Sequence, residues 1–254
     1  MEKINIMTKK YLTVIFGLFL VWNSSAVFSQ EAKNILKKMD EVMFFAKDKK
    51  ADVKLTIENL KNGKVTVKKA QTFEKNGKTL FRYTYPKADS GITSLTASEN
   101  ETYLYLPLFN MVKKITNTSS MGNMNKSDFA LADKPRVSYS NSYQPELINT
   151  TEKAYVLKLT PKFEKNPYSR LVIYVDKKNN YPDIIEYYDK NGKKLKTAKY
   201  HYAKIQGHEV ADMIVMTNEQ KQSRTTIEFS NIKINQGLPD AMFTKENLKK
   251  KKNK

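Results

Sequence analysis

Few side chains in this sequence could carry out covalent or metal-dependent chemistry. The chain contains no cysteine, which excludes a thiolate nucleophile, a disulfide framework and a lipid-modified cysteine. Its two histidines, His201 and His208, flank a Gln-Gly turn with Glu209 and Asp212 nearby, but ordinary surface positions explain these residues better than a metal site does. We find no nucleophile elbow and no phosphate-binding glycine loop. We therefore predict no catalytic residues, no metal, no cofactor and no enzymatic activity.

The first 29 residues have the composition of a targeting segment. Three lysines precede an uncharged apolar run over residues 11–22, and a stretch of small and polar residues ends at Ser29. A membrane-spanning helix needs about 20 apolar residues, so this run favours a cleaved signal peptide over an uncleaved anchor. Cleavage after Ser29 would remove three lysines and one glutamate, which lowers the net charge from +19 to +17. We expect a protein that works outside the cytoplasm.

The rest of the chain predicts one amphipathic helix followed by a long meander of strands. Residues 32–46 carry apolar side chains at helical spacing, and the pattern then changes to a period of two. Asn-Gly turns and short connections indicate antiparallel neighbours, because parallel crossovers need a dozen or more residues. The expected strands are 53–58, 64–75, 78–85, 92–97, 102–106, 153–160, 168–176, 183–189, 193–205, 209–218 and 223–234. We expect residues 119–133 to form a short helix or ordered loop, and residues 238–248 to pack a final helical turn on the sheet.

Several expected strands are apolar on both faces. In 209–218, Ile214 and Met216 alternate with the equally apolar Met213 and Val215. A sheet with one face in water would alternate apolar and polar residues instead. The pattern favours an ordinary two-layer core. It also fits a curved sheet that encloses an apolar cavity.

Five blocks of the chain resemble LolA-like outer-membrane lipoprotein-sorting proteins. Residues 102–107 (TYLYLP) with 112–115 (VKKI) are similar to the family's YLYLP and VRRI segments. The other blocks, in the family's order, are 121–122 with 127–129, 187–193 with 195–197, 216–218 with 223–227, and 237–240 with 243–244. Residues 123–126 interrupt the family's contiguous Met-Gly-Ser-Asp-Phe, and 130–133 differ from the sequence that usually follows it.

The resemblance implies a mainly β fold with short helices. Its sheet would be a strongly curved antiparallel one, an incomplete barrel lidded by helices on its concave side. The half-barrel is shared by lipoprotein carriers, lipid-binding lipoproteins and a periplasmic regulator of the envelope stress response. We therefore expect a signal peptide at 1–29, a single lipid- or lipoprotein-binding domain at 30–248 and a basic tail at 249–254.

On this resemblance, the expected function is that of a soluble, monomeric periplasmic carrier. It would hold the acyl chains of a lipid or lipoprotein and bring them toward the outer membrane, with an RND/MMPL-type transporter and an outer-membrane acceptor as partners. Met and aromatic side chains suit such a cavity because they adapt to flexible chains. The residues expected to line or gate it are Phe81, Tyr83, Leu104, Leu106, Met111, Met121, Met124 and Phe129.

The basic residues bear on two further interpretations. Most lysines fall at turns or alternate strand positions, unlike the clustered lysines and stacking aromatics of a nucleic-acid groove, so we expect no nucleic-acid partner. Lys113 and Lys114 lie near the apolar loop 106–109 and could contact anionic head groups or an acidic partner at the membrane surface, although an ordinary surface loop fits equally well. A sensor or adaptor of the same fold, acting on a transporter or a stress-signalling protein, is the alternative function.

Overall fold

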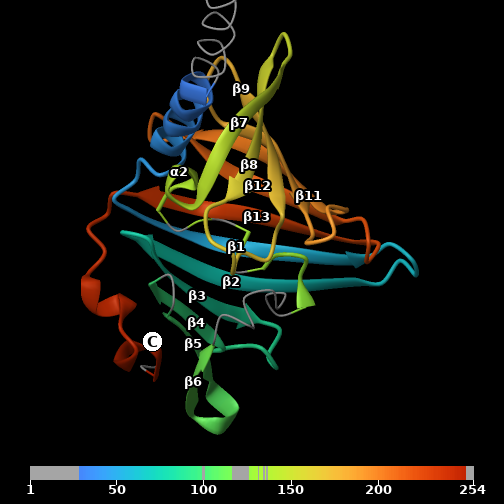
Figure 1. The fold of residues 1–254 in the computed structure, drawn as a ribbon. Helices are drawn as coiled ribbons and strands as arrows, with labels where there is room; N and C mark the ends of the chain where they lie inside the picture. The colour runs from blue at the N-terminus through green and yellow to red at the C-terminus, as the bar shows by residue number, and fades with distance from the viewer. Residues whose placement is uncertain are drawn as a thin grey trace, which may run out of the picture.

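The computed structural model describes residues 29–98, 101–115, 126–130, 132, 133, 135 and 137–249. These residues form a single antiparallel sheet of 13 strands that is strongly curved and does not close into a barrel (Figure 1). The first six strands are β1 (Asp48–Asn59), β2 (Val65–Lys75), β3 (Lys78–Tyr85), β4 (Thr93–Ser98), β5 (Glu101–Leu106) and β6 (Met111–Ile115). The other seven are β7 (Tyr143–Thr150), β8 (Ala154–Pro161), β9 (Arg170–Asp176), β10 (Pro182–Tyr188), β11 (Lys194–Ile205), β12 (His208–Asn218) and β13 (Ser223–Ile234).

The sheet consists of two meanders joined at its centre. Its strand order is β6-β5-β4-β3-β2-β1-β13-β12-β11-β10-β9-β8-β7, so the first and last strands of the chain pair side by side. Leu55 of β1 lies opposite Ile227 of β13 in this pairing. The two edges, β6 and β7, are consecutive in the sequence. The chain between them, which contains the short helix α2 (Tyr139–Ser142), must therefore pass from one edge of the sheet to the other.

Eleven of the strands were expected from the sequence, whereas β6 and β7 were not. Both are edge strands, and neither alternates cleanly between apolar and polar residues. β6 contains two adjacent exposed lysines, and β7 contains Pro145, which cannot donate a hydrogen bond to a neighbouring strand. Lysine and proline are typical of edges because they discourage pairing with another chain.

The N-terminal helix (residues 29–43) confirms the amphipathic pattern, although it ends three residues before the expected boundary. Ala32, Leu36 and Met39 are fully buried against β8–β11. Asp40 then holds α2 in place, because its carboxylate accepts hydrogen bonds from the backbone N–H groups of Tyr139 (2.7 Å) and Ser140 (2.9 Å). In the described part of the chain, no helix has the length and apolar character that crossing a membrane requires.

The C-terminal segment covers part of the other face of the sheet. Two 3-10 turns, η4 (Asp240–Phe243) and η5 (Glu246–Lys249), follow β13, and Figure 1 shows them in red beside β3–β5. Leu238, Phe243 and Leu248 pack on Leu80 and Leu95, as the sequence led us to expect. The Asp48 carboxylate fixes the start of this segment by accepting backbone hydrogen bonds from residues 236–238. Strands β3 and β4 are therefore covered on this face.

Candidate functional site

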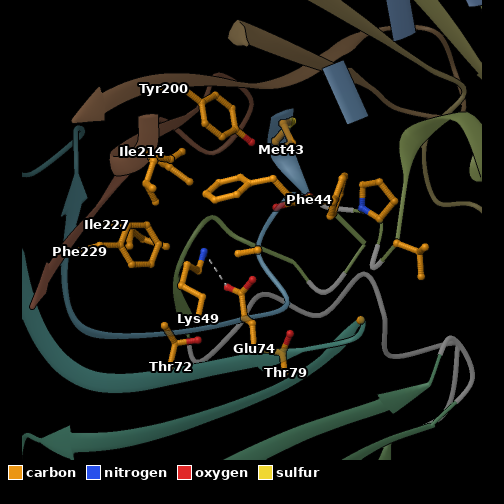
Figure 2. A pocket seen from close by; sticks show the side chains of 18 of the residues that line it. Met43, Phe44, Lys49, Thr72, Glu74, Thr79, Tyr200, Ile214, Ile227 and Phe229 are labelled. Carbon is orange, nitrogen blue, oxygen red and sulfur yellow. Dashed lines mark ion pairs between the residues drawn. The ribbon is translucent and has the colours of Figure 1, made fainter. Parts of the chain in front are cut away.

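A cavity of about 740 Å³ lies on the concave side of the sheet. Its walls come from β1–β4 and β10–β13, and the end of the N-terminal helix closes one side (Figure 2). A further wall is the crossover segment, which we define as the described residues between β6 and α2 (126–130, 132, 133, 135, 137 and 138). The apolar and aromatic residues of the lining include Met43, Phe44, Phe45, Phe81, Phe129, Val210, Ile214, Met216, Ile227, Phe229 and four tyrosines.

The four tyrosines, Tyr181, Tyr187, Tyr200 and Tyr202, form an aromatic wall on β10 and β11 and in the turn before them. The ring centroids of Tyr181 and Tyr202 are 4.6 Å apart, and those of Tyr200 and Tyr202 are 6.2 Å apart. Burial raises the pKa of each of these phenols above its ordinary value of 10.0. The wall is therefore uncharged at neutral pH and offers contact area rather than a nucleophile.

One ion pair projects into the cavity from neighbouring strands. Lys49 of β1 lies opposite Glu74 of β2, and its Nζ atom is 3.2 Å from the Glu74 Oε1 atom (Figure 2). The same Nζ atom lies 5.7 Å from the centroid of the Phe229 ring. Both charged side chains are partly exposed, at 20% and 30%. This ion pair places a cation and an anion at the edge of the apolar lining.

The crossover segment is fastened to the sheet by buried polar contacts. Lys196 of β11, which is 3% exposed, lies 2.7 Å from the Asp133 carboxylate and donates a hydrogen bond to the backbone carbonyl of Asp128 (2.9 Å). Tyr168 donates a short hydrogen bond to Asp133. Asp128 itself accepts a hydrogen bond from the hydroxyl of Thr225 on β13 (2.8 Å). Because each buried charge has partners, the segment can close the concave side at a defined position.

The structure brings two of the predicted cavity residues into the lining, Phe81 and Phe129. Tyr83 is buried beside Phe81, with ring centroids 5.1 Å apart, but it is not a lining residue. Leu104 and Leu106 of β5 are partly buried, and Met111 of β6 is 45% exposed; all three lie away from the cavity lining.

The remaining predicted residues lie on the surface or outside the described chain. Lys113 is exposed on β6, and Lys114 forms an ion pair with Glu101 (3.2 Å). Met121 and Met124 lie outside the described residues.

Sequence reasoning missed the helix end (Met43, Phe44 and Phe45) and the wall formed by β11–β13. One signal could have pointed to this wall: the apolar character of both faces of β12, since Ile214 and Met216 face the cavity. The histidines do not meet. His201 contacts Asp212 (2.7 Å), and His208 stacks on Phe45 with ring centroids 4.5 Å apart. No group of three or more metal-binding side chains occurs among the residues that the structure describes.

Comparisons with known proteins agree on the fold. The profile of a family described as "Uncharacterized protein" matches residues 75–250. A DUF1329 family protein from Desulfovibrio piger superposes with a TM-score of 0.79 at 24% identity, covering 87% of this chain and 99% of that one. A domain from Vibrio parahaemolyticus is described as a "putative outer membrane lipoprotein-sorting protein domain". It superposes with a TM-score of 0.77 at 24% identity, covering 87% of this chain and 100% of that one.

A LolA superfamily protein from Nitrosomonas europaea gives a TM-score of 0.72 at 22% identity, covering 85% of this chain and 98% of that one. A comparison with curated proteins gives no match. These structures share the open, curved sheet, so the expected LolA-like fold is confirmed.

Proposed function

Because the chain belongs to the family whose profile matches residues 75–250 and has a LolA-like fold, we propose that it is a periplasmic carrier of lipid or lipoprotein acyl chains. The observation that carries this proposal is the apolar cavity between the curved sheet, the helix end and the crossover segment. Its volume of about 740 Å³ is in the range of known small-molecule sites. Binding and release, without catalysis, would be its whole chemistry.

The lining suits a flexible hydrocarbon chain. Met43 and Met216 can change rotamers at low cost, and the rings of Phe81, Phe129 and Phe229 offer area with few torsions to restrict. In this proposal, secretion through residues 1–29 brings the protein to the periplasm. An RND/MMPL-type transporter would supply the cargo, and an outer-membrane acceptor would take it.

A native mass spectrum of protein purified without detergent tests the carrier function. We expect bound lipid with the wild type and none with Ile214→Asp, which places a charge in the cavity wall. Phe163→Asp is the matched control: it introduces the same charge at a side chain that is 63% exposed and outside the cavity lining, and it should keep the lipid. Circular dichroism establishes that each variant is folded. A folded wild-type protein that takes up no lipid or lipopeptide, even when these are supplied, would refute the carrier function.

We also propose that the tip between β5 and β6 touches the membrane surface during transfer. The 3-10 turn η1 (Pro107–Phe109) exposes Leu108 by 88% and Phe109 by 68%, and Lys113 lies on the following strand. Exposed apolar side chains beside a cation suit the interface of an anionic bilayer.

Cosedimentation with phosphatidylglycerol vesicles tests this contact. The L108D/F109D variant should bind less. The control Phe163→Asp changes a similarly exposed residue (63%) in the loop between β8 and β9 and should bind as the wild type does. Equal binding by all three proteins would exclude a membrane role for the tip.

A further inference from the structure

Four lysines line one sector of the cavity: Lys47, Lys49, Lys75 and Lys78. Strand pairing gathers them, because Lys75 and Lys78 lie opposite each other across the β2–β3 turn and Asp48, between Lys47 and Lys49, lies opposite Lys75. All four therefore lie at one rim of the sheet, where β1 and β3 begin and β2 ends.

The carboxylates at this rim leave part of the positive charge without an ion pair. The buried Asp48 carboxylate accepts backbone hydrogen bonds from residues 236–238. Glu74 pairs with Lys49 (3.2 Å), and Asp240 pairs with Lys75 (3.0 Å), which also donates a hydrogen bond to the carbonyl of Leu238. Lys47 and Lys78 form no ion pair with any residue that the structure describes.

The other carboxylates of the lining lie away from this sector. Asp133 is held by Lys196, and Glu209 belongs to β12 and accepts a hydrogen bond from the side-chain amide of Asn179 (3.0 Å). The lysine sector therefore offers the two ammonium groups of Lys47 and Lys78, which form no ion pair. A third ammonium group, that of Lys49, could exchange the partly exposed Glu74 carboxylate for an anionic ligand.

Beyond the lysines, the cavity wall becomes apolar. Lys49 lies over Phe229, and Ile227 and Ile214 follow on β13 and β12 (Figure 2). A ligand that matches this sequence of surfaces has a negative group at one end and a hydrocarbon chain at the other. Ammonium groups attract phosphate or carboxylate oxygens more strongly beside apolar walls than in open water.

Resting on the proposed carrier function, we propose that the cargo is an anionic amphiphile. Its phosphate or carboxylate head is bound by Lys47, Lys49 and Lys78, and its acyl chain lies along Phe229, Ile227 and Ile214. The head group stays at the rim, so the chain enters the cavity with its apolar end first. Head-group recognition in this arrangement belongs to the cavity rim rather than to Lys113 and Lys114 on β6.

Two single-chain lipids with the same palmitoyl chain test this assignment. Lysophosphatidylglycerol is anionic and lysophosphatidylcholine is zwitterionic; both are titrated below their micelle-forming concentrations, so that no membrane surface contributes. We expect the wild type to bind the anionic lipid about tenfold more tightly, which corresponds to a few partly exposed ion pairs. The preference should shrink as salt is added.

The K47Q/K78Q double variant should lose most of this preference while its affinity for lysophosphatidylcholine stays the same, which also shows that the variant is folded. The matched control K61Q/K64Q removes the same charge from the exposed turn between β1 and β2, outside the cavity lining, and should keep the full preference. Equal binding of both lipids by the wild type, or a preference that survives in K47Q/K78Q, overturns the head-group assignment and leaves the carrier function intact. Failure to bind either lipid removes the carrier function and the assignment with it.

Discussion

On the concave side of β8–β11, 16 buried residues form one continuous core under the N-terminal helix and α2. On the concave side of β1–β3, the corresponding cluster has only five buried residues, with Ile92, Ile227 and Phe229 partly buried beside it. Strands β8–β11 are richer in apolar residues than β1–β3, and they are also covered by the N-terminal helix. It is long enough to fill one half of the curved sheet, and the cavity is the space that it leaves in the other half.

This contrast assigns different physical tasks to the two halves. We call them the packed half (β7–β12 with the N-terminal helix and α2) and the open half (β1–β6 with β13). The packed half should carry most of the stability, because close packing and full burial determine the cost of removing a side chain. The open half should carry binding together with the cavity-facing residues of β10–β12, because their apolar surface is still available to a ligand.

The largest expected effect is a loss of stability at high pH that arises in the packed half. Burial raises the pKa of Tyr143 to about 12 and those of Tyr139, Tyr168 and Tyr187 above 10.0. Below pH 10 these phenols are protonated in both states. Above it, the unfolded chain releases their protons first, so each tyrosine lowers the free energy of unfolding with a slope that approaches about 1.4 kcal/mol per pH unit. Integrated from pH 10 to 11, the loss is about 1 kcal/mol per tyrosine, or roughly 4 kcal/mol for the four.

Urea unfolding at pH 9, 10 and 11 measures this loss. Tyr143→Phe removes one of the four phenols, so the loss in the free energy of unfolding between pH 10 and 11 should be smaller by about one quarter. A free energy of unfolding that stays constant from pH 9 to 11 would mean that these rings are hydrated in the folded protein.

Breaking the anchor of the crossover segment should have the next largest effect. Lys196→Ala would leave the buried Asp133 carboxylate without its cation, a change that typically costs about 3–5 kcal/mol. Hydrogen exchange should also become faster over residues 126–133, because the segment loses its contact with β11. Lys199→Ala, at an exposed position on the same strand, is the control and should change neither quantity. If hydrogen exchange in the crossover segment is unchanged in Lys196→Ala, contacts other than that with Lys196 hold the segment on the sheet.

Removing a core side chain of the packed half should lower stability without changing lipid binding. Leu36→Ala deletes a fully buried side chain under the packed half and should cost about 3 kcal/mol in urea unfolding. Lipid binding at a temperature where this variant is folded should remain close to that of the wild type. A large loss of affinity would show that the helix forms more of the binding surface than its end.

The smallest effect on stability should come from the open half. Phe229→Ala removes a partly exposed ring that faces the cavity, so we expect a loss of only about 1 kcal/mol, since little packing is broken. Its affinity for lipid should fall about tenfold, as expected when a large contact area is lost. A stability loss as large as that of Leu36→Ala, with binding intact, would reverse the assignment of the two halves.

Local pattern predicted most of the fold because strands and turns are local features. The Asn-Gly turns at 76–77 and 191–192 and the period-two strands beside them needed no tertiary information. The edge strands β6 and β7 were missed because their proline and adjacent lysines reflect their position in the sheet and obscure the alternation.

The cavity was harder to predict because its walls meet only in three dimensions. Phe81 and Phe129 were identified, but Phe229 and Lys49 become neighbours through the pairing of β1 with β13. No short stretch of sequence encodes that pairing. The resemblance drew attention to the motif at 102–107, which the structure places outside the lining.

The pairing of β1 with β13 also has a kinetic consequence. Leu55 and Ile227 meet at the centre of the sheet although 171 residues separate them in the sequence. Contacts between such distant residues form slowly, since a long loop must close before they gain any free energy. Until β13 has been made, β1 of a growing chain can pair only with β2, and the wall between Lys49 and Ile214 is missing. The ligand-binding surface can therefore form only after the chain has been made through β13.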